Sequence, residues 1–224
     1  MAVGGYYLYV VYGFIHVPNP YVSEYHIYVA WPCMASCYYS YYKACTTDPG
    51  YLRKGADKAR IERALKRYPY DNIMFAKGAW CDTCDLPKPA RSKHCSLCNA
   101  CCEKFDHHCV WVNACVGLHN YKWFLLFLLL HSMICIYGLV IGYYIACHLI
   151  DEGDLWNKWY FNQQGQKFRA TTMILIQYLN SVYEMFSIVV FLCAIVTFML
   201  LAFLFYHTYL VKVDRTTNEQ VKAV

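Results

Sequence analysis

The stretch from Trp123 to Ile150 limits the possible folds of this chain more than any other feature of the sequence. It contains no Asp, Glu, Lys or Arg over 28 residues, which as a helix would extend about 42 Å. Because the hydrocarbon core of a bilayer is roughly 30 Å thick, this stretch is long enough to cross it with some tilt. A second uncharged stretch runs from Met185 to Val211. Two membrane-spanning helices are therefore expected, and an ordinary soluble core is excluded.

Two further apolar stretches lie near the start of the chain. Val3 to Val17 is 15 residues long and would reach only about 22 Å, which leaves open that the beginning of this span is truncated. His26 to Tyr42 is rich in tyrosine and carries Pro32, and its rings suit a membrane interface. Counting both as spans, we expect an α-helical polytopic membrane protein with four transmembrane helices.

The basic residues predict the orientation of these spans. None precedes Lys43, fourteen fall between Lys43 and Lys122, and six follow. By the positive-inside rule the middle segment is cytosolic, so four crossings leave both ends of the chain on that side. After the outer loop, Thr171 to Glu184 is amphipathic and predicts an interfacial helix. Four segments are expected along the chain. Residues 1–44 contain spans 1 and 2, and residues 45–120 form a cytosolic cysteine-rich segment. Residues 121–211 contain spans 3 and 4, with an extracytosolic loop at 151–172 between them, and residues 212–224 form a short cytosolic tail.

Cysteines crowd into the cytosolic segment beside histidines. Eight of the fourteen cysteines lie between Cys81 and Cys115. Two CxxC pairs in this crowd favour thiolate metal ligation over disulfides, and therefore a reducing compartment. The segment has little to build an apolar core from, so structural zinc at about 10 kcal/mol per ion would stabilise it. The possible ligands are Cys81, Cys84, His94, Cys95, Cys98, Cys101, Cys102, His107, His108, Cys109 and Cys115.

Two tetrahedral zinc sites would use eight of these eleven side chains and leave three over. If the chain after residue 105 is extended, alternation puts His107 and Cys109 on one face and His108 on the other. His108 could then bind a metal while His107 accepts the proton of Cys109. Asp106 could orient the imidazole, as in a nucleophilic triad.

Spacing alone leaves the choice of nucleophile open. Cys109 could equally be a ligand, with Cys115 as the spare thiol, and Cys102 is ambiguous as well. Histidines inside the predicted spans are interpreted as packed or hydrogen-bonded side chains in preference to a proton path. They are His131, His148 and His207.

Taken together, these residues resemble the DHHC-type protein S-acyltransferases, or palmitoyltransferases. The resemblance covers the Asp-His-His-Cys run 106–109, the cysteine spacing and the position of this segment between the second and third spans. Two shorter motifs also match, Asp48-Pro49-Gly50 and Thr216-Thr217-Asn218-Glu219. Alone, these would be interpreted as an ordinary turn and a capping box. Further matching residues are Pro87, Arg91, Asn120 and Phe124.

The resemblance implies two structural zinc ions and a separate nucleophile. The first zinc would be held by Cys81, Cys84, His94 and Cys101, and the second by Cys95, Cys98, His108 and Cys115. Cys102 is then not a ligand. Cys109 would attack the thioester of an acyl-CoA, with His107 as the general base and Asp106 positioning it.

The implied reaction is transfer of a long-chain fatty acyl group, palmitoyl above all, from acyl-CoA to cysteine thiols by a two-step ping-pong mechanism. Expected partners are acyl-CoA, membrane-associated proteins with cytosolic cysteines and the lipid bilayer, and no nucleic acid. The expected location is the endoplasmic reticulum, the Golgi or the plasma membrane, with a cytosolic active site. Arg91, Lys93 and Lys122 are candidates for binding the CoA phosphates, although positive-inside charge is the simpler account of them.

Two alternatives follow from the same residues. A zinc-stabilised membrane adaptor would carry an inert or structural Cys109 and form no acyl-enzyme. A catalytically impaired family member, suggested by the short tail after Glu219, would keep the zinc fold and transfer the acyl group poorly. Acyl-enzyme formation and transfer, wild type against Cys109→Ser, would distinguish all three.

Overall fold

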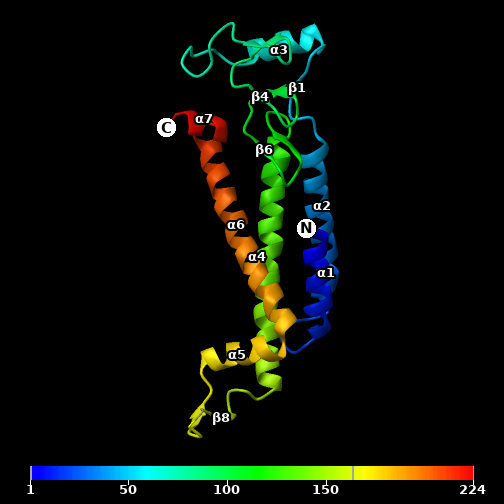
Figure 1. Cartoon of the computed structure of the whole chain (residues 1–224). Coiled ribbons are helices and arrows are strands. Elements are labelled where there is room, and N and C mark those ends of the chain that lie inside the picture. The colour runs from blue at the N-terminus through cyan, green and yellow to red at the C-terminus, as the bar shows by residue number, and fades with distance from the viewer. Residues whose placement is uncertain (1, 163, 224) are drawn as a thin grey trace. The chain divides into compact units, whose positions relative to one another are not determined.

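A computed structural model describes residues 2–162 and 164–223 (Figure 1). The chain divides into two compact units, Met1–Ala35 with His131–Leu201 (unit 1) and Ser36–Leu130 with Ala202–Val224 (unit 2). The helices are α1 (Ala2–Tyr12), the 3-10 helix η1 (Phe14–His16), α2 (Tyr25–Thr46), α3 (Lys58–Arg67), α4 (Tyr121–Glu152), α5 (Thr172–Val182), α6 (Glu184–Lys212) and α7 (Thr217–Lys222). The strands are β1 (Tyr51–Leu52), β2 (Trp80–Cys81), β3 (Leu86–Pro87), β4 (Lys93–Cys95), β5 (Ala100–Cys102), β6 (His107–Cys109), β7 (Ala114–Val116), β8 (Trp159–Phe161) and β9 (Lys167–Arg169).

Helices α4 and α6 are the two that, among the described residues, are long and apolar enough to cross a membrane. They contain 32 and 29 residues and so extend about 48 and 44 Å. On α6, Phe191, Phe198 and Phe205 recur every seven residues and remain 65%, 75% and 67% exposed. Large apolar side chains exposed in a row suit a lipid environment. The two predicted uncharged spans are confirmed as helices.

The first two predicted spans are less clear in the structure. Helix α1 ends at Tyr12, after eleven residues, and is followed by η1. Helix α2 is 22 residues long with Pro32 inside, long enough to cross at about 33 Å, but its many tyrosines make it less apolar than α4 or α6. Neither helix is both as long and as apolar as a helix needs to be to cross a membrane, unlike α4 and α6. The structure thus supports two of the four predicted spans.

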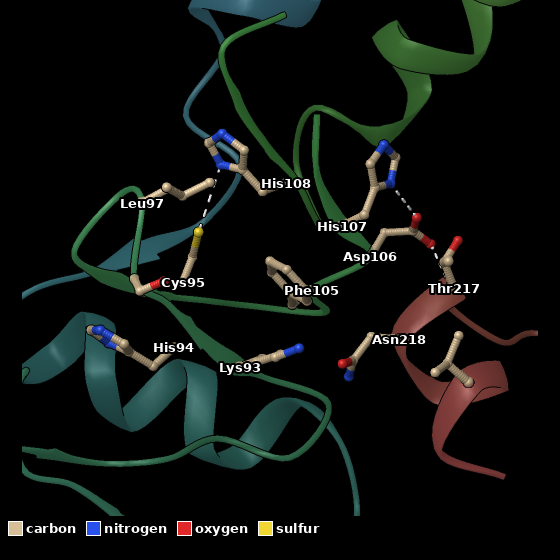
Figure 2. A pocket seen from close by; sticks show the side chains of 12 residues that line it. Lys93, His94, Cys95, Leu97, Phe105, Asp106, His107, His108, Thr217 and Asn218 are labelled. Carbon is tan, nitrogen blue, oxygen red and sulfur yellow. Dashed lines mark hydrogen bonds and ion pairs between the residues drawn. The ribbon is translucent and has the colours of Figure 1, made fainter. Parts of the chain in front are cut away.

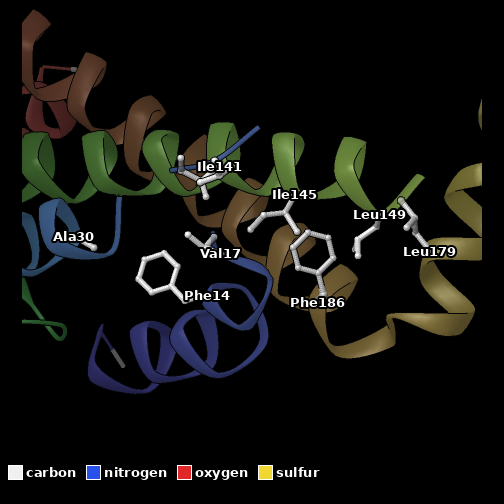
Figure 3. Packing of buried hydrophobic residues seen from close by; sticks show 9 residues of the cluster. Phe14, Val17, Ala30, Ile141, Ile145, Leu149, Leu179 and Phe186 are labelled. Carbon is white, nitrogen blue, oxygen red and sulfur yellow. The ribbon is translucent and has the colours of Figure 1, made fainter. Parts of the chain in front are cut away.

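Unit 1 has an apolar core built around the second half of α4. Figure 3 shows Ile141, Ile145 and Leu149, spaced along one face of that helix, among rings that include Phe14 and Phe186. This four-residue spacing is the period at which helical side chains share a face. Ile145 is completely buried.

The loop 151–172 between α4 and α5 contains a hairpin that the sequence did not predict. Strands β8 and β9 pair antiparallel with Trp159 opposite Arg169, whose guanidinium lies 4.1 Å from the indole ring centre. Helix α5 follows and confirms the helix predicted after this loop. Its N-cap is Thr171, whose side chain accepts the backbone N–H of Ile174, as a Ser or Thr cap commonly does.

The cysteine-rich part of unit 2 consists of short hairpins and loops. Strands β1, β5 and β4 form one sheet in that order, and β2–β3 and β6–β7 form two further hairpins. The buried side chains among them are largely cysteines, joined by Leu52, Ala64, Leu86 and Phe105. Ala64 comes from α3, which is capped by Asp57. So small an apolar core leaves most of the stabilisation to another source.

Candidate functional site

Two groups of metal-ligating side chains form in unit 2 because of strand register. In the β4–β5 hairpin His94 lies opposite Cys101, and in the β6–β7 hairpin His108 lies opposite Cys115. Each pair is completed by a CxxC turn. The residues that follow these turns, Asp85 and Asn99, have left-handed φ values of 54° and 47°, which Asp and Asn tolerate better than most residues.

The first group brings together Cys81, Cys84, His94 and Cys101, whose ligand atoms all lie within 4.8 Å of one another. Nδ1 of His94 is 3.6 Å from the sulfur of Cys81 and 3.3 Å from that of Cys84. A tetrahedral zinc would hold sulfur and nitrogen ligands about 3.6 Å apart, given its usual bond lengths. The donor set and spacing therefore fit a zinc ion. Burial and neighbouring thiols raise the pKa of Cys101, and a bound cation would favour the thiolate form of this residue.

The second group brings together Cys95, Cys98, His108 and Cys115. The sulfurs of Cys98 and Cys115 are 3.5 Å apart, and Nδ1 of His108 is 3.3 Å from Cys98 and 3.8 Å from Cys115. These distances again match a tetrahedral ion. Cys102 belongs to neither group, although it is fully buried; its thiol lies 3.7 Å from the carbonyl oxygen of Pro49. The eight residues are those that the family resemblance implied.

Cys109 stands apart from both groups and beside His107. The side chains of strand β6 alternate between its two faces, as predicted. His107 and Cys109 share one face, and His108 points the other way, toward Cys95 (Figure 2). Nδ1 of His107 hydrogen bonds to Oδ2 of Asp106 at 2.7 Å. Asp106 and Cys109 are 2% and 4% exposed, so the three groups interact in a largely dry setting where charges are weakly screened.

The electrostatics of these three residues favour an imidazolium–thiolate pair. Burial by itself would lower the pKa of His107, but the Asp106 carboxylate and the Cys109 thiol raise it to about 9. Burial opposes ionisation of Cys109, yet the contact with His107 and the backbone N–H groups after it lower the pKa of the thiol. Burial likewise opposes ionisation of Asp106, and the His107 hydrogen bond outweighs it and lowers that pKa. A thiolate is the nucleophilic form of cysteine.

Helix α7 supplies a contact that sequence reasoning missed. The backbone N–H of Thr217 donates to Oδ1 of Asp106 at 2.9 Å, so both carboxylate oxygens are bound. The predicted capping box is also present: Thr216 accepts the N–H of Glu219, and Glu219 accepts the N–H of Thr216. The ordinary interpretation of this motif was correct but incomplete, because the cap also aims the next N–H at Asp106.

Arg91 fastens α7 to the cysteine-rich hairpins. Its Nε and one terminal nitrogen bind the two carboxylate oxygens of Glu219 at 2.6 and 2.7 Å, and it also contacts Asp214. Glu219 is 4% exposed, so this is a buried, two-pronged ion pair. All three side-chain nitrogens of Arg91 are therefore engaged by Glu219 and Asp214, which accounts for its charge within the chain. Lys93 and Lys122 lie over the rings of Phe105 and Trp123.

The Asp48-Pro49-Gly50 turn and Asn120 brace the base of the hairpins. Oδ1 of Asp48 accepts the N–H of Gly50, which adopts φ +109°, a conformation that favours glycine. Asn120 is fully buried and hydrogen bonds to the carbonyl oxygens of Ala44, at the end of α2, and Cys115. Asn120 thereby links the second metal group to the two helices that flank the segment.

A cavity of ≈ 370 Å³ opens beside the Asp106–His107 pair (Figure 2). Lys93 and Phe105 line one side, and Thr217 and Asn218 of α7 line another. Both metal groups contribute to it, through His94, Cys95 and His108. Asp106 and His107 therefore have a neighbouring space on the side of α7, and Cys109 is not among the residues that line it.

Comparison with known proteins gives consistent matches. A family profile described as DHHC palmitoyltransferase matches residues 74–224. The palmitoyltransferase ZDHHC4 of Bos taurus is 36% identical over 179 residues, covering 80% of this chain and 51% of that protein. Palmitoyltransferase swf1 of Schizosaccharomyces pombe is 35% identical over 190 residues, covering 83% and 47%. The chain spans about half the length of the curated relatives it matches.

Proposed function

This chain belongs to the DHHC palmitoyltransferase family, and from that premise we propose that it transfers a long-chain acyl group from acyl-CoA to cysteine thiols of membrane-associated proteins. One observation carries the proposal. Among the described cysteines between Cys81 and Cys115, only Cys109 lies beside a histidine that is hydrogen bonded to a carboxylate. The other histidines of this segment face the thiols of the two metal groups. That pairing is the arrangement of a nucleophile with its base.

The proposed reaction has two steps. The thiolate of Cys109 attacks the thioester carbon of acyl-CoA, the carbon–sulfur bond to CoA breaks, and His107 gives its proton to the departing CoA thiolate. A thiol of the protein substrate then gives its proton to His107 and attacks the acyl-cysteine, which restores the Cys109 thiolate. Asp106 keeps the imidazole oriented and stabilises its charge throughout.

Two structural zinc ions are part of the proposal. Their donor sets, three thiolates and one imidazole each, are those of closed structural sites with no open position for substrate. Zinc there would hold the hairpins together, so that His107 and Cys109 keep their register. The chemistry itself falls to Asp106, His107 and Cys109.

We further propose four membrane crossings, with α1 and α2 as the first two, and a cytosolic active site at the bilayer boundary. Cys109 precedes the start of α4 by twelve residues, so the thiol is tethered close to a membrane helix. Such a position suits the substrate, since each methylene of the acyl chain costs about 0.8 kcal/mol to expose to water. An endomembrane or plasma-membrane location accords with substrates anchored at cytosolic surfaces.

The test is acyl-enzyme formation by purified protein with labelled palmitoyl-CoA, followed by transfer to a cysteine peptide. Wild type should label on Cys109 through a thioester that hydroxylamine cleaves, and Cys109→Ser should not. Full labelling of Cys109→Ser would contradict the proposed role of Cys109 as the nucleophile. No labelling of zinc-replete wild type would favour the adaptor alternative, and labelling without transfer would favour the impaired enzyme.

A further inference from the structure

A second histidine in unit 2 packs against His107. His207 of α6 is completely buried, and its ring centre is 5.7 Å from that of His107, with the two ring planes tilted by 38°. Its Nδ1 lies 3.0 Å from the hydroxyl oxygen of Tyr121, the first residue of α4. The sequence predicts a packed or hydrogen-bonded histidine at this position, and in the structure it packs on the proposed catalytic base.

Two phenylalanine rings complete the surroundings of His107. The ring centre of Phe124, on α4, is 5.3 Å from that of His107, and the ring centre of Phe203, on α6, is 6.0 Å away. The same two rings stand edge-on to His207, with centres 5.1 and 4.6 Å from it. Aromatic pairs in such arrangements contribute about 0.5–1.5 kcal/mol each beyond the area they bury. His107 is thus enclosed by one ring from α4 and two from α6.

The hydrogen bond to Asp106 does not by itself fix the imidazole of His107. It holds Nδ1 at 2.7 Å, which leaves Nε2 as the nitrogen that faces the Cys109 thiol. The torsion between Cβ and an imidazole ring has only a broad preference, so one bond at Nδ1 still allows the ring to tilt. A tilt moves the opposite nitrogen the furthest. The surrounding rings oppose this tilt and so keep Nε2 directed at the sulfur.

Space filling alone does not account for an imidazole at position 207. Nε2 of His207 is buried and has no hydrogen-bond partner among the described side chains and backbone. Leaving a buried polar group without a partner costs on the order of 1–3 kcal/mol, which an apolar ring of similar size would avoid. The imidazole does provide one contact that an apolar ring cannot, the hydrogen bond with Tyr121 that joins α6 to α4.

We propose that His207 is a positioning residue for His107, and that its hydrogen bond with Tyr121 keeps α4 and α6 close enough to hold Nε2 of His107 on Cys109. Tyr121 and His207 are 86 positions apart, one at the beginning of α4 and the other near the end of α6. The base is therefore braced from both membrane helices. The inference rests on the proposed function, in which His207 touches no reacting atom and exchanges no proton.

The test is a double-mutant cycle on the full chain with Tyr121→Phe and His207→Leu, measured by single-turnover labelling with palmitoyl-CoA. Each change should lower the maximal rate of acyl-enzyme formation about 10-fold or more, because a displacement of about 1 Å at a reacting group can cost 10²-fold. The palmitoyl-CoA concentration at half-maximal rate should stay within about 2-fold, since substrate binding is not touched. Because Tyr121 acts through His207, the double variant should be no slower than His207→Leu alone.

Tyr209→Phe is the matched control, because Tyr209 lies two residues from His207 and is 52% exposed. It should label at the wild-type rate. A second readout needs no acyl-CoA: alkylation of Cys109 by iodoacetamide at pH 7, located by mass spectrometry. It should slow about 3-fold or more in His207→Leu, because a His107 that can tilt away supports less of the reactive thiolate.

Labelling of His207→Leu at the wild-type rate would overturn the positioning role, and so would losses in the two single variants that add up in the double variant. If His207→Leu does not retain two zinc ions, Tyr121→Phe decides instead, since it removes one oxygen and keeps the ring. Wild-type rates of labelling and alkylation in Tyr121→Phe would then reject the brace. If wild type forms no acyl-enzyme, the alkylation rates still decide whether His207 positions His107, and only the proposed function falls.

Discussion

At the scale of single residues, Asp106 has both carboxylate oxygens engaged by hydrogen bonds. One oxygen accepts from His107 and the other from the backbone of Thr217, while the residue is 2% exposed. Two fixed hydrogen bonds leave the carboxylate no freedom to rotate. Its orientation, and through it that of His107, is therefore determined by segments from both ends of unit 2.

Asp106→Asn should lower the rate of acyl-enzyme formation by roughly 10²- to 10⁴-fold, the range attributed to correctly oriented acid–base groups. The amide can still accept from Thr217 but no longer stabilises a charged imidazole. Single-turnover labelling with palmitoyl-CoA measures the effect. Asp71→Asn is the control, because Asp71 accepts backbone N–H groups in an exposed turn; equal rates in the two variants would contradict the role of Asp106.

Cys101 and Cys102 allow the metal sites to be tested with adjacent, equally buried thiols. Both are 0% exposed, but only Cys101 belongs to a metal group. Cys101→Ser should reduce the zinc content from two ions to one per chain and expose the hairpins to protease, because a structural zinc contributes about 10 kcal/mol or more. Cys102→Ser should keep two ions. Atomic emission on folded protein measures both, and identical zinc contents would reject the assignment.

At the scale of elements, α7 depends on its surroundings. It has six residues, too few for a stable helix in isolation. The capping box, the Arg91–Glu219 ion pair and the bond to Asp106 hold it in place. The same helix thus both closes one side of the site and relies on it for its own structure.

Thr217→Pro isolates the backbone contact to Asp106. Thr217 is the first residue of α7, a position where proline is well tolerated, and Thr216 before it is already extended (ψ 161°). Proline lacks the N–H, so a hydrogen bond to a charged group worth about 1.5–3 kcal/mol is lost. We expect acyl-enzyme formation to slow about 10-fold or more.

Thr217→Ala keeps the N–H and serves as the matched control for that experiment. Its rate should stay within about 2-fold of wild type, because only a methyl group and a hydroxyl are removed. Palmitoyl-CoA labelling and the thermal midpoint should be measured together for the proline and alanine variants. A proline variant as fast as the alanine variant would mean that the contact is incidental.

The elements also show which features the sequence could predict. CxxC spacing and strand alternation are local patterns, and they indicate a metal-binding segment; the choice of its eight ligands, and of Cys109 as the spare thiol, came from the family resemblance. Helices α4 and α6 could be predicted because charge is absent over a whole span. Thr217 was not, since it lies 111 positions from Asp106 and bonds through its backbone, which carries no side-chain signature. The sequence predicts only a packed histidine at His207, because nothing nearby in the chain indicates that its ring centre lies 5.7 Å from that of His107. The β8–β9 hairpin joins residues of mixed polarity with no clear alternation.

At the scale of the whole molecule, the proposed topology can be tested with single substitutions. Gln164→Thr creates an Asn-Gln-Thr acceptor at Asn162, in the loop proposed to be extracytosolic, and Met74→Thr creates Asn-Ile-Thr at Asn72, on the side proposed to be cytosolic. The chain otherwise contains no Asn-x-Ser/Thr acceptor. In microsomes only Gln164→Thr should gain an N-glycan, seen as an endoglycosidase-sensitive mobility shift. Glycosylation at Asn72 instead would show that the orientation is the reverse of the proposed one.

The bond between Thr217 and Asp106 also sets an order of events during biosynthesis. All eight zinc ligands lie within residues 81–115, so the ribosome delivers a complete metal-binding segment early. Thr217 follows Cys109 by 108 residues, which at ordinary elongation speeds is roughly 5 to 20 s later, after α4 and α6 have been made. The nascent chain therefore passes through a stage that can hold zinc but lacks one of the two bonds on Asp106. On the proposed mechanism, the complete set of hydrogen bonds on Asp106 therefore forms only after both membrane helices have been synthesised.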